Sequence, residues 1–526
     1  MPAAFLLAAL LCAPSLQEPG ERAYEPVPGL PDLLAVRDTR RELPLRLEDV
    51  VRLAVENAPA IRQAHLQNLA DLGAVESAEG AFDPLLNGDL SFTYSEVPTA
   101  GGLFDGVPKV HARTWRASQG LSQLLVSGGT LSATFTESYT EDNQPVNFFG
   151  INPQSDVAGT LTLTQPLLRG AWELNATRNL RSAELGFDRN LAGLRHTQVQ
   201  TLQAAVDAYW DLAFALRDVE VKEFSLELGM ELRDVTLARY RAGTVAQVDV
   251  VQAEADIASR AGALLSARNS LRQAEDALRN LVFRLQETEE WELALLPVSE
   301  PPAPEPVEMD WRVAWEEARK WRADLRQARV DVEQSRLDWE VARRNLLPSL
   351  DLNGSITSSG LDAQVGDAFN PVFDFVSAGW SLGLSFEVPL GNRTARGAEQ
   401  QARIGYFLAL RRLHDLERDI QVEVRDAVRN LNFLAEQVKV NAKASEVARR
   451  QLDAEQRRLE EGASTNFQVL QFQEDLINAL TAEQQSKFAF AKAWSRLNTV
   501  RGLGWDGTIP DLEPLEDFEP RDLPAD

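Results

Sequence analysis

The sequence is short of the residues that build metal and disulfide sites. It has 1 cysteine and 4 histidines among 526 residues. One cysteine cannot form an internal disulfide, and the scattered histidines lack the clustered spacing of a zinc or iron site. Serine-nucleophile elbows, phosphate-cradling loops and Cys/His pairs are also missing from the sequence. We therefore expect no metal, no cofactor and no enzyme activity.

Basic residues are also in deficit. The chain has 53 Lys and Arg against 79 Asp and Glu, a formal net charge of −26. Nucleic-acid partners require a basic surface, so nucleic acid is excluded as a partner. Hydrophobic residues at 44% and charged residues at 25% are typical of a chain that folds.

No stretch of sequence approaches the roughly 20 apolar residues of a membrane-spanning helix, so a membrane location would require strands. The longest apolar run lies within residues 1–16, a signal-like segment that no Lys or Arg precedes. Cys12 follows Leu11, where lipoprotein signals usually carry Gly, Ala or Ser. Two fates of Cys12 stay open, lipidation and removal with the signal.

Proline-rich acidic segments punctuate the chain. Residues 17–44 and 505–526 lack any periodicity and are predicted to be mobile tails. Residues 286–309 are similar in composition and interrupt the middle of the sequence. We expect this central segment to be a connector.

An internal two-fold repeat organises the rest. Residues 58–64 align with residues 322–328, and several further short matches follow in the same order. The matches predict a first repeat at 45–285 and a second at 310–504. The first repeat carries about 40 extra residues between its proline landmarks.

Each repeat has the same order of predicted elements. A helix of roughly 36 residues, at 45–80 or 310–345, stops before a proline. Strands follow at about 85–167 and 349–389, where apolar residues alternate with Ser, Thr and Gly. The prolines that mark the junctions between strands and helices are Pro84, Pro166, Pro348 and Pro389.

Long helices come next. From about residue 172 to residue 241 there is no proline and little glycine, and Ile420 to Val438 follows the 4–3 spacing of a coiled coil. Gly243 and Gly462 suit left-handed C-terminal caps before a second, antiparallel helix. We expect two long helical hairpins, at 171–285 and 395–502, and an α+β chain that is mainly α.

The strand pattern fits either a soluble sandwich with one wet face or an outer-membrane barrel. Helices too long for a compact domain and the signal-like segment favour the barrel. The sequence offers about six strands, whereas membrane barrels begin at eight, so several copies would have to share one barrel. The hairpin of residues 115–121 and 131–139 is extra in the first repeat, and a trimer would have 18 strands with it or 12 without it.

The ordered set of these segments resembles the TolC-type outer-membrane efflux proteins, chiefly at residues 45–59, 165–170, 243–253 and 462–472. The resemblance implies a homotrimer whose shared transmembrane β-barrel crosses outer-membrane lipid and whose trimeric α-barrel extends into the periplasm. It implies a periplasmic adaptor and an inner-membrane transporter as partners in a tripartite efflux or type I secretion system. The alternative is a periplasmic adaptor or structural coiled-coil protein, although an adaptor would have one hairpin rather than two.

The resemblance also implies a periplasmic gate at the hairpin tips. Asp249 falls on the acidic position after Gly243, while Gln468 and Gln471 stand in the second repeat where some relatives carry aspartate. The alternative role of Asp249 is a carboxylate stabilised by the helix N-terminus, and the two roles are compatible. The tip residues, as turn formers or adaptor contacts, are Gly243, Thr244, Gly462 and Ala463.

Overall fold

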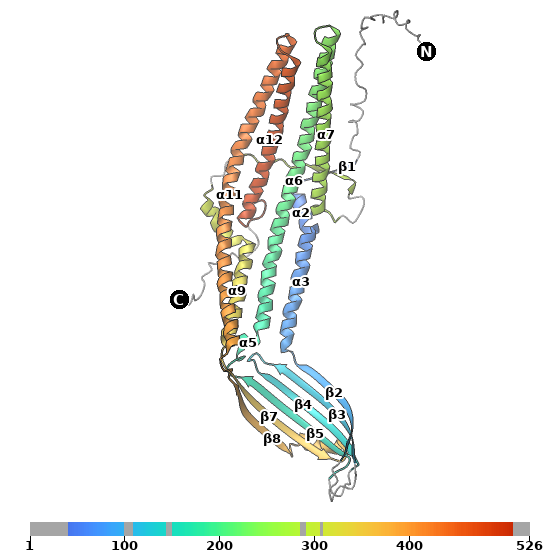
Figure 1. The fold of residues 1–526 in the computed structure, drawn as a ribbon, viewed down its shortest axis with the longest axis vertical. Helices are drawn as coiled ribbons and strands as arrows, with labels where there is room; N and C mark the ends of the chain where they lie inside the picture. The colour runs from blue at the N-terminus through green and yellow to red at the C-terminus, as the bar shows by residue number, and fades with distance from the viewer. Residues whose placement is uncertain (1–39, 99–108, 144–149, 285–290, 306–308, 509–526) are drawn as a thin grey trace, which may run out of the picture.

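The computed structural model describes residues 40–98, 109–143, 150–284, 291–305 and 309–508. The signal-like segment with Cys12, most of the predicted N-terminal tail and residues 509–526 lie outside these ranges. The described chain is elongated, with a layer of long helices standing on a tilted β-sheet (Figure 1). This confirms the prediction of a mainly helical chain with long helices and a separate sheet.

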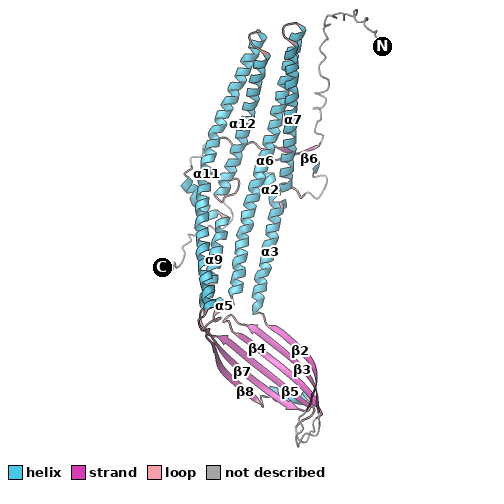
Figure 2. Ribbon diagram, in the orientation of Figure 1, coloured by secondary structure: helices cyan, strands magenta, loops and turns pink. Residues whose placement is uncertain are grey.

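In the described part of the chain, the long helices α6, α7, α11 and α12 form two hairpins, whose turns lie at the end farthest from the sheet (Figure 2). The first hairpin consists of α6 (Arg178–Arg241) and α7 (Gln247–Val282), and the second of α11 (Arg393–Glu460) and α12 (Asn466–Val500). Helix α6 packs on both α7 and α12, so the two hairpins are joined side by side. At 1.5 Å per residue, the 64-residue α6 is about 95 Å long.

Shorter helices continue the layer where α7 and α12 end. They are α2 (Leu47–Asn57) and α3 (Pro59–Glu79), packed on α6, and α8 (Trp311–Trp321) and α9 (Ala323–Arg344), packed on α11. The predicted continuous helices at 45–80 and 310–345 are wrong, because each is broken once. Ala58 is extended because Pro59 follows it. Arg322 is extended at the other break, where its guanidinium bonds Asp324 at 2.7 Å and Glu423 at 2.8 Å.

Within the ranges that the structure describes, the sheet has six antiparallel strands in the order β2-β3-β4-β5-β7-β8. Strands β3 and β4, the extra hairpin of the first repeat, lie inside this sheet, and β2 and β8 are its edges. The strands are β2 (Leu85–Pro98), β3 (Lys109–Leu124), β4 (Thr130–Asp142), β5 (Gln154–Pro166), β7 (Ser349–Asp362) and β8 (Ala378–Glu387).

The strand register gives the sheet one apolar and one polar face. Leu161 pairs with Ile356, which pairs with Trp380, so these side chains share a face. The intervening residues, such as Thr160 and Thr357, share the other face. The apolar face is largely exposed in the single chain, and Trp380 is 80% exposed. An exposed apolar surface of this kind marks a contact site, so this face of the sheet requires an apolar partner.

A small two-stranded parallel sheet was not predicted from the sequence. Strand β1 (Arg41–Leu45) pairs with β6 (Leu293–Pro297). The segment predicted as a mobile tail at 17–44 therefore ends in a strand, and the predicted connector at 286–309 contains one. Five-residue strands are too short to show a period in the sequence. The Tyr209 hydroxyl of α6 donates to the Leu45 carbonyl at 3.1 Å and accepts from the Ser299 amide at 2.8 Å. It fastens both segments to the helical layer.

Two further elements differ from the predictions. Helix α10 (Val365–Phe373) lies between β7 and β8, inside the range predicted as strands, and Pro371 within it obscured its helical pattern. Trp505, assigned to the C-terminal tail, packs against the core cluster that includes Val50 and Trp210. In the described part of the chain, no helix combines the length and apolar character needed to cross a bilayer.

Candidate functional site

The two hairpin tips close in the same way. Gly243 and Gly462 have φ of 73° and 75°, the left-handed region that favours glycine. The Thr244 amide donates to the Arg239 carbonyl at 3.0 Å, and the Ala463 amide to the Arg458 carbonyl at 2.8 Å. The four predicted tip residues are all exposed. They are turn formers that also present a free surface in the single chain.

Asp249 and Gln468 occupy equivalent positions at the start of α7 and α12. The Asp249 carboxylate accepts from the Ala246 amide at 3.1 Å, and Gln468 Oε1 accepts from the Thr465 amide at 3.3 Å. Thr465 Oγ1 accepts in return from the Gln468 amide at 3.4 Å, which completes a capping box in the second hairpin only. Ala246 has no side-chain acceptor. Two of the three predicted gate residues, Asp249 and Gln468, therefore stabilise helix starts.

Gln471 lies one turn further along α12 and is exposed. Asp249 lies on α7 of the first hairpin. The two hairpins are neighbours because α6 packs on both α7 and α12. Among the described residues, no hydrogen bond or ion pair joins Asp249 to Gln468 or Gln471. One copy of the chain thus contributes separate polar groups to the tip region rather than a cluster.

Polar contacts between the hairpins were not predicted. Near the tips, the Arg239 guanidinium donates to the Leu459 carbonyl, and Asn466 Nδ2 donates to Thr236 Oγ1 at 3.0 Å. Thr236 is fully buried. These contacts join α6 to the second hairpin within one turn of its tip.

Deeper in the layer, Arg260 of α7 reaches across α6. Its guanidinium donates to the Ser225 carbonyl at 2.7 Å and to Gln473 Oε1 of α12 at 2.9 Å. A Cβ at Gly229 would lie 3.1 Å from Arg260 Cδ, so glycine there leaves room for the crossing. The available sequence signal was Gln473 itself, a polar residue where the 4–3 spacing from Val469 to Leu476 calls for an apolar one.

The four junction prolines lie where strands meet the helical layer. Pro84 and Pro348 directly precede β2 and β7, Pro166 ends β5, and Pro389 follows β8. The Arg169 amide donates to the Pro348 carbonyl at 3.2 Å. This bond ties the two halves of the chain together at the junction.

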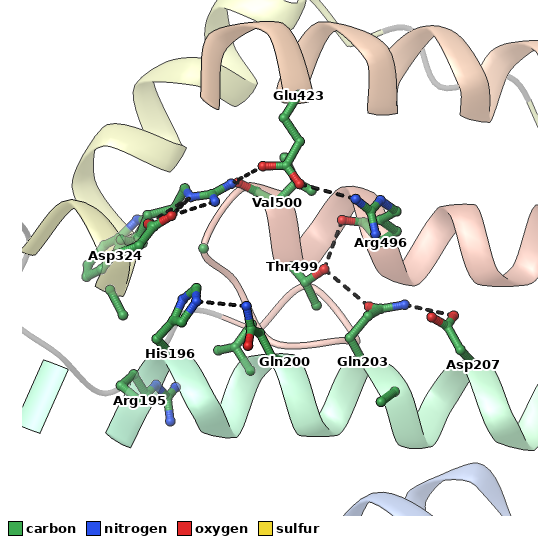
Figure 3. A pocket seen from close by; sticks show the side chains of 16 residues that line it. Arg195, His196, Gln200, Gln203, Asp207, Asp324, Glu423, Arg496, Thr499 and Val500 are labelled. Carbon is green, nitrogen blue, oxygen red and sulfur yellow. Dashed lines mark hydrogen bonds and ion pairs between the residues drawn. The ribbon is translucent and has the colours of Figure 1, made fainter. Parts of the chain in front are cut away.

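A polar cavity of about 320 Å³ lies at the break between α8 and α9 (Figure 3). Arg496 of α12 donates to Glu423 at 3.3 Å on one side, and Gln203 of α6 donates to Asp207 at 3.0 Å on the other. Burial alone would raise the pKa of Asp324, but its bonds to Arg322 hold it below the ordinary value. Burial raises the pKa of Asp207 above its ordinary value, although the nearby positive charge of Lys492 acts to lower it.

Asp207→Asn is expected to stabilise the protein at neutral pH. The folded state holds the Asp207 proton more tightly than the unfolded chain does, so ionisation costs stability as the pH rises from 3.8 through the folded pKa. Asparagine cannot ionise. Thermal melts followed by helical circular dichroism should show a higher Tm for the variant at about pH 7.5, and a smaller difference at about pH 4. A lower Tm at neutral pH would contradict this.

Among the described residues, no group of three or more His, Cys, Asp or Glu side chains is placed to hold a metal ion. The arrangement is a long helical layer with polar tips, joined to a sheet whose apolar face is uncovered. In the comparison with protein families, the family described as "Outer membrane efflux protein" matches residues 134–282 and 314–503, more than half of the chain. The chain belongs to this outer membrane efflux protein family.

Individual relatives agree with the family assignment. This efflux protein is 26% identical over 378 residues to "Outer membrane protein TolC" of Escherichia coli strain K12, covering 70% of this chain and 73% of that protein. It is 24% identical over 354 residues to "Nodulation protein T" of Rhizobium leguminosarum bv. trifolii, covering 66% of this chain and 72% of that protein. The predicted family resemblance is confirmed.

Solved structures share the fold. The CmeC outer membrane channel of Campylobacter jejuni superposes with a TM-score of 0.65 at 16% identity, over 89% of this chain and 87% of that one. Together with the family match and the similarity to TolC, this makes the efflux protein an outer-membrane efflux channel, as predicted. The family consists of channels rather than enzymes.

Proposed function

We propose that three copies of this efflux protein form one continuous conduit across the outer membrane and into the periplasm. The observation that carries the proposal is the open sheet, whose edge strands β2 and β8 have no partner on their outer sides in the described chain. Unpaired backbone amides and carbonyls cost several kcal/mol each in hydrocarbon. A sheet with this apolar face must therefore be closed by other copies.

The strand directions suit closure. Strands alternate in direction across the six-stranded sheet, so β8 of one copy would lie antiparallel to β2 of the next. Three copies would give 18 strands, because the extra hairpin lies in the sheet. Such head-to-tail contacts generate a ring when the rotation closes. The larger of the two strand counts left open by the sequence is the one we propose.

The helical layer also has uncovered apolar edges. Leu66 and Leu72 of α3 are exposed on one edge, and Phe433 and Val440 of α11 are exposed on the other. Residues 433 and 440 are one heptad apart, as expected for a helix–helix seam. Packing the α11 edge of one copy on the edge formed by α3 and α7 of the next would cover these residues and form an α-barrel.

We propose that the exposed tips at Gly243, Thr244, Gly462 and Ala463 meet a periplasmic adaptor, which connects the conduit to an inner-membrane transporter. Similarity to TolC-type channels supports this tripartite efflux or secretion role. The chain itself supplies passage, not covalent chemistry. Cargo would be chosen mainly by the transporter.

Assembly can be tested by light scattering in detergent. The intact protein is expected to have about three times the 58.3 kDa chain mass. Phe433→Lys with Val440→Lys should lower the trimer fraction by placing charges in the seam, while Lys439→Glu, an exposed change beside the seam, should not. A monomeric wild-type protein that conducts ions would overturn the proposal.

Three copies of Asp249 around a pore would crowd negative charge and attract cations. Asp249→Asn keeps an oxygen that can accept from the Ala246 amide but removes the charge, so it separates gating from helix capping. We expect weaker block by multivalent cations in planar bilayers, and higher conductance for Asp249→Ala, which also loses the cap. Unchanged conductance and block in both variants would remove Asp249 from the gate.

A further inference from the structure

Helix α10 lies on the apolar face of the sheet, in a seat made by two glycines. A Cβ at Gly360 of β7 would lie 2.0 Å from the Ala368 carbonyl oxygen. A Cβ at Gly159 of β5 would lie 3.3 Å from Val372 Cγ1. Any larger residue at position 360 would push the helix away. The sequence therefore accommodates the helix on the face that otherwise carries large apolar side chains.

The side of α10 that faces the sheet makes apolar contacts, whereas the C-terminal end of the helix is exposed. Ala368 and Val372 are buried against Val157, and the Phe369 ring stacks on Phe135 with 5.2 Å between centroids. Phe373, at the helix end, is 70% exposed. The end of α10 thus projects a large aromatic ring over the neighbouring strands.

Beside this end, a groove of about 470 Å³ runs across the apolar face. Its volume is within the ~300–1,000 Å³ range of small-molecule sites. No charged side chain lines it. Its lining includes Leu86, Leu121, Ala133, Leu161, Ile356 and Phe373.

We propose that this groove holds one hydrocarbon chain of an outer-membrane lipid, clamped between α10 and the sheet. The proposal rests on the proposed conduit, in which the apolar face of the sheet meets lipid. Strand backbones beneath the groove are already paired in the ladder, so they offer a peptide no hydrogen bonds. An uncharged and mainly apolar lining, with Gln119 and Ser358 as polar members on this face, continues the apolar face and fits a hydrocarbon chain.

A second copy of the chain is a poorer occupant. Helix α10 packs on β5 and β7, in the interior of the sheet. Neighbouring copies would join at the edges, β2 and β8. Only Leu86 of the lining comes from an edge strand, so the groove would open mainly toward lipid after assembly, and a chain held there would exchange more slowly than the surrounding lipid.

Photolabelling tests the proposal. The full-length protein is reconstituted in phospholipid vesicles with a trace of phospholipid carrying a diazirine in its acyl chain, then diluted into unlabelled vesicles before illumination. Labelled residues are mapped by mass spectrometry. Without dilution, we expect label on Trp380 and Leu382 of β8 and on the groove. After dilution, the label on β8 should fall while the label on β4 and α10 persists.

Ala133→Trp, which fills the groove, should lower the retained label several-fold. Ala117→Trp is the matched control, since Ala117 lies on the same face but does not line the groove. If label on β8 and on the groove falls equally on dilution, only ordinary surrounding lipid is present and the clamp is wrong. If β8 is never labelled, the membrane arrangement of the proposed function fails instead. Crosslinks between copies through the groove would assign it to a second chain.

Discussion

Arg260→Met is expected to raise the conductance of the channel several-fold. The substitution keeps an unbranched side chain beside Gly229 but removes the guanidinium that links α7 to Gln473 of α12. Hydrogen bonds to charged groups contribute about 1.5–3 kcal/mol each. Losing that much from the arrangement in which α7 and α12 are joined shifts its equilibrium with one in which they part by about 10- to 150-fold, and parting of the hairpins would widen the proposed entrance. Single-channel recording in planar bilayers measures the change.

Arg268→Met is the matched control for this experiment. Arg268 lies two turns further along α7 and donates to Glu223 of α6 at 2.9 Å, a contact within the first hairpin. The pair is partly exposed, so its loss should cost about 0–1 kcal/mol. We expect wild-type conductance. Equal conductance in the two variants would show that Arg260 does not hold the hairpins closed.

Glu275→Ala is expected to loosen the attachment of β1 and β6 to α7. Glu275 is 3% exposed and accepts from the Arg40 guanidinium at 3.0 and 2.7 Å. Arg279, 2% exposed, lies 3.8 Å from the same carboxylate and donates to the Leu293 carbonyl of β6. Removing one partner of a buried ion pair costs about 3–5 kcal/mol, because it leaves buried charge uncompensated.

Hydrogen exchange read by mass spectrometry localises this effect. A loss of about 3 kcal/mol in a local opening reaction speeds exchange on the order of 100-fold, and the amides of residues 41–45 and 293–297 should report it. Asp276→Ala is the control: its carboxylate bonds Arg279 at 2.5 Å but is 59% exposed, so exchange should change little. Unchanged protection of β1 and β6 in Glu275→Ala would contradict the clamp.

The elements that could be predicted are those whose signal is local and repeated. Alternation at Leu131, Ala133 and Phe135 indicates a strand, and β4 covers these residues. The glycines at 243 and 462 indicate helix ends, and α6 and α11 end within two residues of them. Twenty or more residues in one period outweigh single exceptions. The long helices and the strand groups were therefore visible, while the two-fold repeat itself stays a prediction.

The elements that could not be predicted depend on distant partners. Strand β1 pairs with β6, some 250 residues away, and neither five-residue segment carries a period. Helix α10 is recognisable only through its seat at Gly159 and Gly360, since either glycine alone reads as a weak strand position. The Arg260–Gln473 contact joins two helices whose relative rotation no single-chain pattern fixes.

The strand order has a consequence for how the chain reaches its native state. Strand β5 ends at Pro166, and its neighbour β7 begins at Ser349. The six-stranded sheet therefore cannot be completed until the first helical hairpin and the connector after it have been synthesised. Pairings between segments so far apart in the sequence form slowly, and the strand edges stay unpaired until they form. Until β7 has been made, the β5 edge is unpaired and open to pairing with other chains.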